Sequence, residues 1–534
     1  MAALACAIGL TVKYGSTYRP VVEPVREIEE IWALEDAREE SGEPLVTRLF
    51  CNGIPMAYDA ENNVFYGSLG LENGAQWPEI KLTASEETAK GLSLCFADDY
   101  GFDDCDAAIR EGYSYQIFAY TDTAYSYAEV VFTGLPLVNV TADQTIERED
   151  VPAQIEIALA AEGLQTNGRI HKRGGASILN DKVGYKLEFT RTTDGKKKIY
   201  REIPGMGTDS QVILLPMNAL DTTMMRDRLS WALYARLTRR DEPFSARKTQ
   251  YCELFLNGEY RGVYLMLEPF SVRQEVAKAG EERLTTDSVY RTAVISLSHG
   301  RPCMEDPYSA ATGFELYYPM DGEPDFSPLA DYFALLGETD DAAFMRRAAQ
   351  IIDLDSALRY DVVLQLFGLT DNVINNMYTW AQNSRGHTRY RFDFWDLDVS
   401  WGLKRDEIGE MHENWVFFPL VDRLLRADEE GGVRQRYGEI YREVREKAFD
   451  TETVEALVGQ YAHELNDSGA MARNAERWET ENYAADGYEL VAFAAERIAL
   501  LDEPVRAMSA GEEIDLRFLE KTNYDDKGTP LSEE

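Results

Sequence analysis

The most constraining feature of this 534-residue chain is the order of elements predicted between Asp353 and Trp401. Apolar residues repeat every four positions from 358 to 366, which predicts an amphipathic helix that ends near Gly368. Three further segments then follow in a fixed order, namely a polar loop, a hairpin of two strands and an acidic corner: 371–376, 377–380 with 390–394, and 395–398. A segment with this order requires a fold in which helices and strands pack together.

The loop and the corner carry side chains suited to phosphoryl transfer. Asp371 precedes Asn376 by five residues, and Asp396 and Asp398 follow the second strand. Protein kinases have the same order, with a catalytic Asp, an Asn five residues later and a metal-binding Asp after two short strands. Such a site needs one carboxylate beside the acceptor hydroxyl and hard oxygen ligands around Mg²⁺. The alternative is a pair of loop-capping residues with a buried Asp396 that accepts backbone hydrogen bonds.

Lysines that could contact a phosphate lie in an earlier segment. A glycine-bearing turn after Arg173 leads into a strand that ends near Phe189. The period of two places Lys182 and Lys186 on one face of that strand, so the sequence does not choose between them. The alternative reading is an exposed hairpin strand with one polar face.

The segment between the lysines and the acidic corner predicts a helix and a hairpin. The helix is expected from about Thr222 to Arg239, with Asp221 as its cap. It contains no Glu to pair with a strand lysine, only Asp227, so the usual kinase Lys–Glu pair is not evident. The pattern from 251 to 267 predicts a hairpin with an Asn-Gly turn, and Glu268 follows it directly.

The residues before this unit differ in character. Short apolar or aromatic runs alternate with turn residues, which predicts a small antiparallel β domain, sandwich-like, with a binding or spacer role. The predicted organisation is α+β, with a lead-in and signal remnant, the β domain, a larger mixed unit and an acidic tail: 1–44, 45–135, 136–505 and 506–534.

Net charge and motif content exclude several classes of protein. A net charge of −40 argues against binding nucleic acid or an anionic membrane and favours basic partners. No apolar run is long enough to span a membrane. The six cysteines form no C-x-x-C motif and the five histidines no H-E-x-x-H motif, which disfavours a zinc hydrolase. Buried free thiols are expected, and the oligomeric state is not predicted.

Residues from about 135 to 505 resemble the CotH family, the spore coat protein H kinases. Five stretches carry the resemblance: Arg173-Gly with Ser177 and Tyr185-Lys-Leu187, Leu214-Leu215 with Met225-Arg-Asp-Arg-Leu229, Glu253-Leu-Phe-Leu-Asn-Gly-Glu-Tyr-Arg-Gly-Val-Tyr-Leu265, Asp371 with Asn375-Asn-Met-Tyr378, and Phe394-Trp-Asp-Leu-Asp-Val-Ser-Trp-Gly402. The resemblance implies an atypical protein-kinase-like fold that uses ATP with Mg²⁺ or Mn²⁺. It also implies phosphorylation of Ser, or Thr, in extracytoplasmic, surface or coat proteins rich in Ser, Lys and Arg.

The resemblance also implies a role for individual positions. Asp371 matches the catalytic Asp. Asn376 (or Asn375) and Asp396 match the metal ligands, and Asp398 would make a second metal contact. The remaining positions would bind the nucleotide. Lys182 or Lys186 would contact a phosphate, Arg173 and Ser177 belong to the glycine loop, and Glu268 would lie near the base or ribose.

Two departures from the family pattern favour other readings. Ala176 replaces a hydroxyl in the glycine loop, and Val183 replaces a lysine. They suggest reduced activity or a surface scaffold that keeps the fold without catalysis. A related transferase, directed at nucleotidyl groups or glycans, would use the same lysine and carboxylates.

Overall fold

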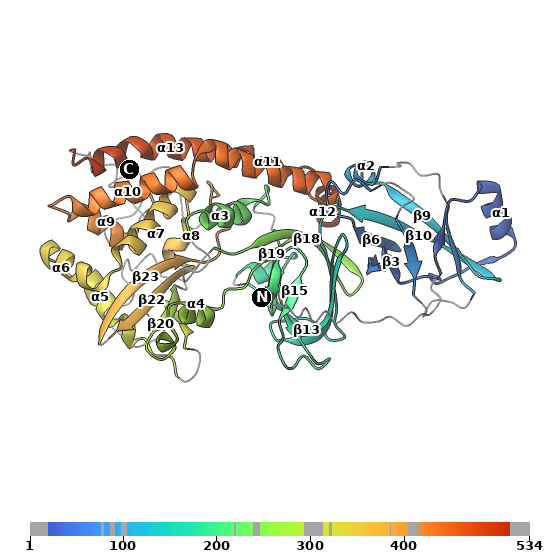
Figure 1. The fold of residues 1–534 in the computed structure, drawn as a ribbon, viewed down its shortest axis with the longest axis horizontal. Helices are drawn as coiled ribbons and strands as arrows, with labels where there is room; N and C mark the ends of the chain where they lie inside the picture. Colours follow the sequence, from blue (N-terminus) through green and yellow to red (C-terminus); the bar gives the residue numbers. More distant parts are fainter. Residues whose placement is uncertain are drawn as a thin grey trace, which may run out of the picture.

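The computed structural model places three regions in succession along the long axis of the molecule (Figure 1). It describes residues 20–75, 80–85, 91–97, 104–174, 176–217, 221–238, 246–292, 313–319, 323–384, 386–403, 415–416 and 418–512. The predicted signal remnant at 1–19 and the tail from 513 onward lie outside these residues.

The N-terminal region is rich in strands. Its larger sheet has the order β1-β8-β9-β10-β6-β5, with β2 also paired to β10, and a small sheet has the order β4-β3-β7. The elements are β1 (Val22–Glu23), α1 (Ile28–Asp36), β2 (Glu39–Glu40), β3 (Leu49–Cys51), β4 (Ile54–Pro55), β5 (Ala57–Asp59), β6 (Val64–Ser68), β7 (Leu82–Ala84), β8 (Ser93–Phe96), α2 (Cys105–Arg110), β9 (Ser114–Tyr120) and β10 (Ala124–Thr133).

The larger sheet is mixed, which corrects the antiparallel arrangement predicted from the sequence. Strands β1 and β8, β2 and β10, and β6 and β10 pair in parallel. The chain between β6 and β10 is long enough for the crossover that parallel pairing needs. The segment predicted as a lead-in contributes β1, α1 and β2, and Ile31 of α1 is buried beside Cys95 and Phe118 of the sheet. The four described cysteines are buried and lie outside any disulfide, as predicted.

A closed barrel follows, with the strand order β11-β12-β13-β14-β17-β19-β18. Alternate side chains of β14, such as Tyr185 and Leu187, fill its interior, because successive strand residues point to opposite faces. Its elements are β11 (Leu137–Thr141), β12 (Val151–Leu159), β13 (Glu162–Arg173), η1 (Ala176–Leu179), β14 (Gly184–Thr190), the hairpin β15 (Arg201–Ile203) and β16 (Gly207–Asp209), β17 (Gln211–Leu215), α3 (Arg226–Ala235), β18 (Thr249–Leu256) and β19 (Glu259–Leu267).

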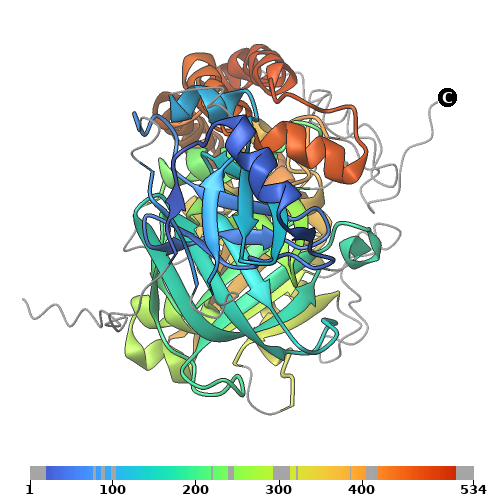
Figure 2. The ribbon, with the colours of Figure 1, turned by 90° about the vertical axis from the view of Figure 1, so that its right-hand side faces the viewer.

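Turn chemistry fixes the hairpin of β18 and β19 as predicted. Asn257 and Gly258 both have positive φ, 54° and 77°, which suits the two central residues of a tight turn. Figure 2 views the molecule from the N-terminal end, where the first sheet overlaps the barrel. A small apolar cluster that includes Tyr66 and Phe255 joins the two.

The third region is mostly helical around a sheet of order β21-β20-β22-β23. Helix α7 ends at Phe367 before Gly368, whose φ of 65° is left-handed, and β22 and β23 form the predicted hairpin. The elements are α4 (Val272–Lys278), η2 (Glu281–Thr285), β20 (Ser288–Thr292), β21 (Phe314–Tyr318), η5 (Ser327–Leu329), α5 (Ala330–Leu336), α6 (Asp341–Ile351), α7 (Leu354–Phe367), α8 (Asp371–Ile374), β22 (Met377–Ser384), β23 (His387–Phe394), α9 (Pro419–Arg426), α10 (Gly432–Lys447), α11 (Thr451–Asp467), α12 (Ala470–Trp478) and α13 (Tyr488–Ser509).

The barrel and the helical region share one core. Outward-facing barrel residues such as Ile213 and Leu265 belong to the same apolar cluster as α3, α7 and β22. Helix α12 lies against the barrel, where Arg473 donates to both carboxylate oxygens of the buried Glu253 at 2.9 and 2.8 Å (Figure 1). The chain is thus a mixed fold of helices and sheets, consistent with the α+β prediction. Among the described residues, no helix combines the length and the apolarity needed to cross a membrane.

Candidate active site

Asp371 begins the short helix α8, directly after the turn that follows α7. The residue is 3% exposed, and each of its carboxylate oxygens accepts a hydrogen bond from a neighbouring amide. Asn375 Nδ2 donates to Oδ1 at 3.0 Å and Asn376 Nδ2 donates to Oδ2 at 2.8 Å. The two amides therefore fix the direction of the carboxylate, and the Asp–Asn spacing noted in the sequence corresponds to a direct contact.

One backbone and one side-chain hydrogen bond join this loop to the acidic corner after β23. The Trp395 N–H donates to the Asn376 carbonyl at 2.9 Å, and Asn372 Nδ2 donates to the Trp395 carbonyl at 2.7 Å. Asn376 and Asp396 both have positive φ, 59° and 57°, a left-handed conformation that Asn and Asp adopt more readily than other non-glycine residues. The loop of Asp371 and the corner of Asp396 therefore form one connected unit.

Carboxylates crowd this unit. Burial, followed by the charge of Asp396, raises the pKa of Asp227 to about 8. Burial and then the carboxylates of Asp396, Asp227 and Asp371 raise the pKa of Asp398 well above its ordinary value. Because the Asp398 residue is exposed to solvent, the neighbouring carboxylates are the main cause of this rise in pKa. Four acidic side chains thus influence one another at this corner.

One face of α3 packs on the segment that contains the corner. Trp401 Nε1 donates to Ser230 Oγ at 2.8 Å, and Tyr234 Oη donates to Asp393 at 2.9 Å. The backbone N–H of Leu397 lies near enough to Asp227 to act on its carboxyl. These α3 residues are spaced by three and four positions, so they share one face of the helix. The helix begins at Arg226, later than predicted, and Asp221 accepts its first backbone N–H at 3.1 Å.

Two cationic side chains of the barrel lie toward the corner. Arg173, at the end of β13, lies over the Trp395 ring at 5.9 Å, and its charge acts on both Asp227 and Lys186. Burial and the charge of Lys198 lower the pKa of Lys186. Within the described part of the chain, the Lys186 ammonium makes no hydrogen bond or ion pair. Arg173 therefore lies near enough to act on both Lys186 and the Asp227 carboxylate.

Lys182 lies in a different environment. It sits in the bend before β14, not on the strand, which corrects the prediction that both lysines share a strand face. Its ammonium donates to the Val263 carbonyl at 2.7 Å and to Asn474 Oδ1 of α12 at 2.9 Å. Burial lowers the pKa of Lys182 to about 7. No hydrogen bond or ion pair joins it to an acidic residue of the corner among the described residues.

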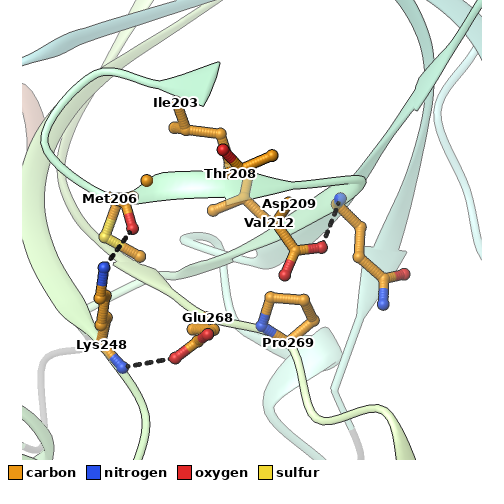
Figure 3. A pocket seen from close by; sticks show the side chains of 10 residues that line it. Ile203, Met206, Thr208, Asp209, Val212, Lys248, Glu268 and Pro269 are labelled. Carbon is orange, nitrogen blue, oxygen red and sulfur yellow. Dashed lines mark hydrogen bonds between the residues drawn. The ribbon is translucent and has the colours of Figure 1, made fainter. Parts of the chain in front are cut away.

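The remaining predicted residues lie at the edges of this arrangement. Ser177 belongs to the 3-10 turn η1, close to Gly174. Glu268 follows β19 and lines a cavity of about 170 Å³ beside Lys248, Asp209 and Val212 (Figure 3). The Lys248 backbone N–H donates to Glu268 Oε2 at 3.1 Å. Among the described residues, no hydrogen bond or ion pair connects Glu268 with the acidic corner.

Within the same described residues, no set of three or more His, Cys, Asp or Glu side chains is arranged to hold a metal ion. Two residues of the site were not predicted from the sequence. Asn372 was given no role, and Asp227 was noted only as the one acidic residue of a helix without Glu. The signal for Asp227 was its spacing from Ser230 and Tyr234, which places three polar side chains on one face of α3.

A family model described as CotH kinase protein matches residues 170–501, which is more than half of the chain. The chain belongs to this family. The matched residues run from the end of β13 to α13 and include every predicted site residue. A search of curated proteins found no match.

Proposed function

We propose that the chain is an atypical protein kinase that transfers the γ-phosphate of ATP to Ser or Thr of protein substrates. The observation that carries the proposal is the junction of the Asp371 loop with the Asp396 corner, through hydrogen bonds between Asn376, Trp395 and Asn372. Membership of the CotH kinase family supports a phosphotransferase, and the arrangement supports a single centre for acceptor and phosphate.

In this proposal each acidic residue has a separate task. Asp371, oriented by Asn375 and Asn376, would accept the proton of the substrate hydroxyl. Asp396 and Asp398 would hold Mg²⁺ or Mn²⁺, with the Asn376 amide oxygen as a further ligand. The donors fit these cations, which prefer oxygen ligands and commonly take only one or two carboxylates together with substrate phosphates. When bound, the cation supplies charge stabilisation to the phosphoryl oxygens.

Basic side chains complete the proposed nucleotide site. We assign the phosphate contact to Lys186, because the charge of Arg173 acts on both Lys186 and Asp227 and because Lys182 is already held by Val263 and Asn474. Arg173 and Ser177 would border the phosphates, and Glu268 would lie toward the base or ribose. The net charge of −40 supports basic substrates. The family resemblance is the basis for proposing that these substrates are rich in Ser, Lys and Arg and that the location is extracytoplasmic or at a surface.

A catalytically weak scaffold is the second candidate. The engagement of Lys182 by neutral acceptors favours it, together with the absence of a preformed three-residue metal group among the described residues. A related nucleotidyl or glycan-directed transferase would differ in the mass added to its acceptor.

A phosphate-transfer assay tests the proposal. Wild-type protein is incubated with γ-labelled ATP and Mg²⁺ or Mn²⁺, with and without a Ser/Lys/Arg-rich peptide. Asp396→Asn should abolish labelling, whereas Asp361→Asn, a buried carboxyl of α7 bonded to Tyr437, should not. Absence of label together with absence of nucleotide binding would contradict the kinase proposal and favour the scaffold. An added mass larger than a phosphate would favour the related transferase.

A further inference from the structure

Asp227 presents a buried acceptor atom that has no partner. The residue is 4% exposed, and its Oδ1 makes no hydrogen bond with any described residue. Burying a carboxylate oxygen without a partner is costly, and such atoms in folded proteins call for an explanation. Asp227 lies in the first turn of α3, inside the family-matched part of the chain.

The neighbours of Asp227 show that its carboxylate lies near the acidic corner. After burial, the groups that act most strongly on its carboxyl are Asp396 and the backbone N–H of Leu397, the residue that follows Asp396. Asp396 is its strongest charged neighbour, and Asp227 in turn acts on Asp398. The carboxylate is therefore held beside two others of the same sign, an arrangement that a cation would stabilise.

Pairing with a strand lysine does not account for Asp227. Lys182 is held by the Val263 carbonyl and Asn474, and Lys186 makes no ion pair among the described residues. Arg173 is the one cation among the strongest electrostatic neighbours of Asp227, and it lies over the Trp395 ring. The helix carboxylate thus faces the acidic corner.

Contacts on both sides of Asp227 fix α3 against this corner. Arg226 Nε donates to the Ser400 carbonyl at 3.1 Å, and Trp401 donates to Ser230. Residues before and after Asp227 are therefore bonded to the 400–401 segment. These contacts fix the position of Asp227 as closely as a ligand-binding side chain requires.

We propose that Asp227 is a ligand of the divalent cation, shared with Asp396, so that α3 contributes directly to metal binding. The inference rests on the proposed function, since it concerns the cation of that same site. In this assignment Asp227 takes the place given above to Asp398, which is exposed. Asp227 and Asp396 then supply two carboxylates, the usual protein share of a Mg²⁺ or Mn²⁺ site, with waters and phosphates supplying the rest. This agrees with the absence of a three-residue group among the described side chains.

Direct Mn²⁺ binding tests the assignment without reference to activity. Free Mn²⁺ is measured by electron paramagnetic resonance during titration of the full chain, and thermal unfolding is followed with and without Mn²⁺. We expect Asp227→Asn and Asp396→Asn each to weaken Mn²⁺ binding about tenfold or more. Both should also remove the rise in unfolding temperature that Mn²⁺ causes in the wild type. The matched control is Asp361→Asn, a carboxyl that is also buried in the helical region, and it should bind as the wild type does.

The variants separate failure of this inference from failure of the kinase proposal. Wild-type Mn²⁺ affinity in Asp227→Asn, beside lost affinity in Asp396→Asn, would overturn the role of Asp227 and leave the kinase site intact. Absence of Mn²⁺ binding in the wild type would overturn the role of Asp227 as well, and the labelling assay then decides the proposed function. Asp227→Ala serves as a second variant if the unfolding curve without Mn²⁺ shows that Asp227→Asn is not folded.

Discussion

The side-chain amide of Asn372 donates a 2.7 Å hydrogen bond to the carbonyl oxygen of Trp395. The same nitrogen reaches the Asn376 carbonyl at 3.4 Å, and the Asn372 residue is fully buried. One side chain therefore holds the end of the Asp371 loop and the start of the Asp396 corner together. Tyr360 of α7 also holds the loop, because its hydroxyl donates to the Asn372 carbonyl at 2.6 Å.

Removing this amide should loosen the proposed site. Asn372→Ala leaves the buried Trp395 carbonyl and the partly buried Asn376 carbonyl without this donor, so we expect the free energy of unfolding to fall by about 1–3 kcal/mol. We also expect kcat for peptide phosphorylation to fall about tenfold, with a smaller effect on KM for ATP, because the loop and the corner lose their alignment. Urea unfolding and steady-state kinetics measure the two effects. Asn167→Ala, on the partly exposed face of β13, is the control, and equal losses in both variants would contradict a specific role.

Asp371 should be required for the chemical step but not for folding. Asp371→Asn keeps the size of the side chain while removing the proton acceptor, so we expect phosphorylation to fall by about 10²–10⁴. The control is Asp353→Asn at the other end of α7, where Asp353 caps the helix by accepting the Ser356 N–H, a role that Asn also fills. Peptide labelling at saturating ATP gives the rates. Near-normal labelling by Asp371→Asn would exclude Asp371 as the base.

Local turn and capping chemistry accounts for the parts of the fold that the sequence predicts well. The Asn257-Gly258 turn and the α7 end at Gly368 follow from backbone conformations that few residues adopt. The contact of Asp371 with Asn376 also follows from their short separation along the chain. These features depend on residues that are close in sequence.

Contacts between distant segments account for what the sequence did not predict. Asp227 in α3 and Asp396 in the acidic corner are separated in the sequence by all the elements from β18 to β23, so no local pattern reports the environment of Asp227. The position of Lys182 depends on Val263 and Asn474, which lie in β19 and α12. The parallel pairing of β6 with β10 likewise depends on a crossover whose direction the strand patterns do not encode.

The two lysines should respond differently to the same substitution. We expect Lys186→Met to raise KM for ATP about tenfold or more with little change in stability, because its ammonium is proposed to contact phosphate. Lys182→Met should leave KM for ATP near the wild-type value and change thermal stability, because Lys182 is buried among Val263, Asn474 and the Tyr264 ring. Nucleotide titrations and unfolding curves of both variants provide the comparison. The reverse pattern would reassign the phosphate contact to Lys182.

The pH dependence of stability should carry a contribution from Asp361. Burial raises the pKa of this α7 carboxyl to about 8, although Tyr437 and Gln365 both donate to it. The folded protein therefore keeps a proton that the unfolded chain releases near pH 4, and stability falls as the pH rises from about 4 to 8, by up to about 1.4 kcal/mol per pH unit for one group. Asp361→Asn removes this contribution, so the difference in unfolding free energy between variant and wild type should shift in favour of the variant between pH 5 and 8. Altered hydrogen bonding in the variant adds a constant to this difference and does not change how it varies with pH. Urea unfolding at several pH values measures it, and parallel curves for the two proteins would show that Asp361 is ionised in the fold throughout this range.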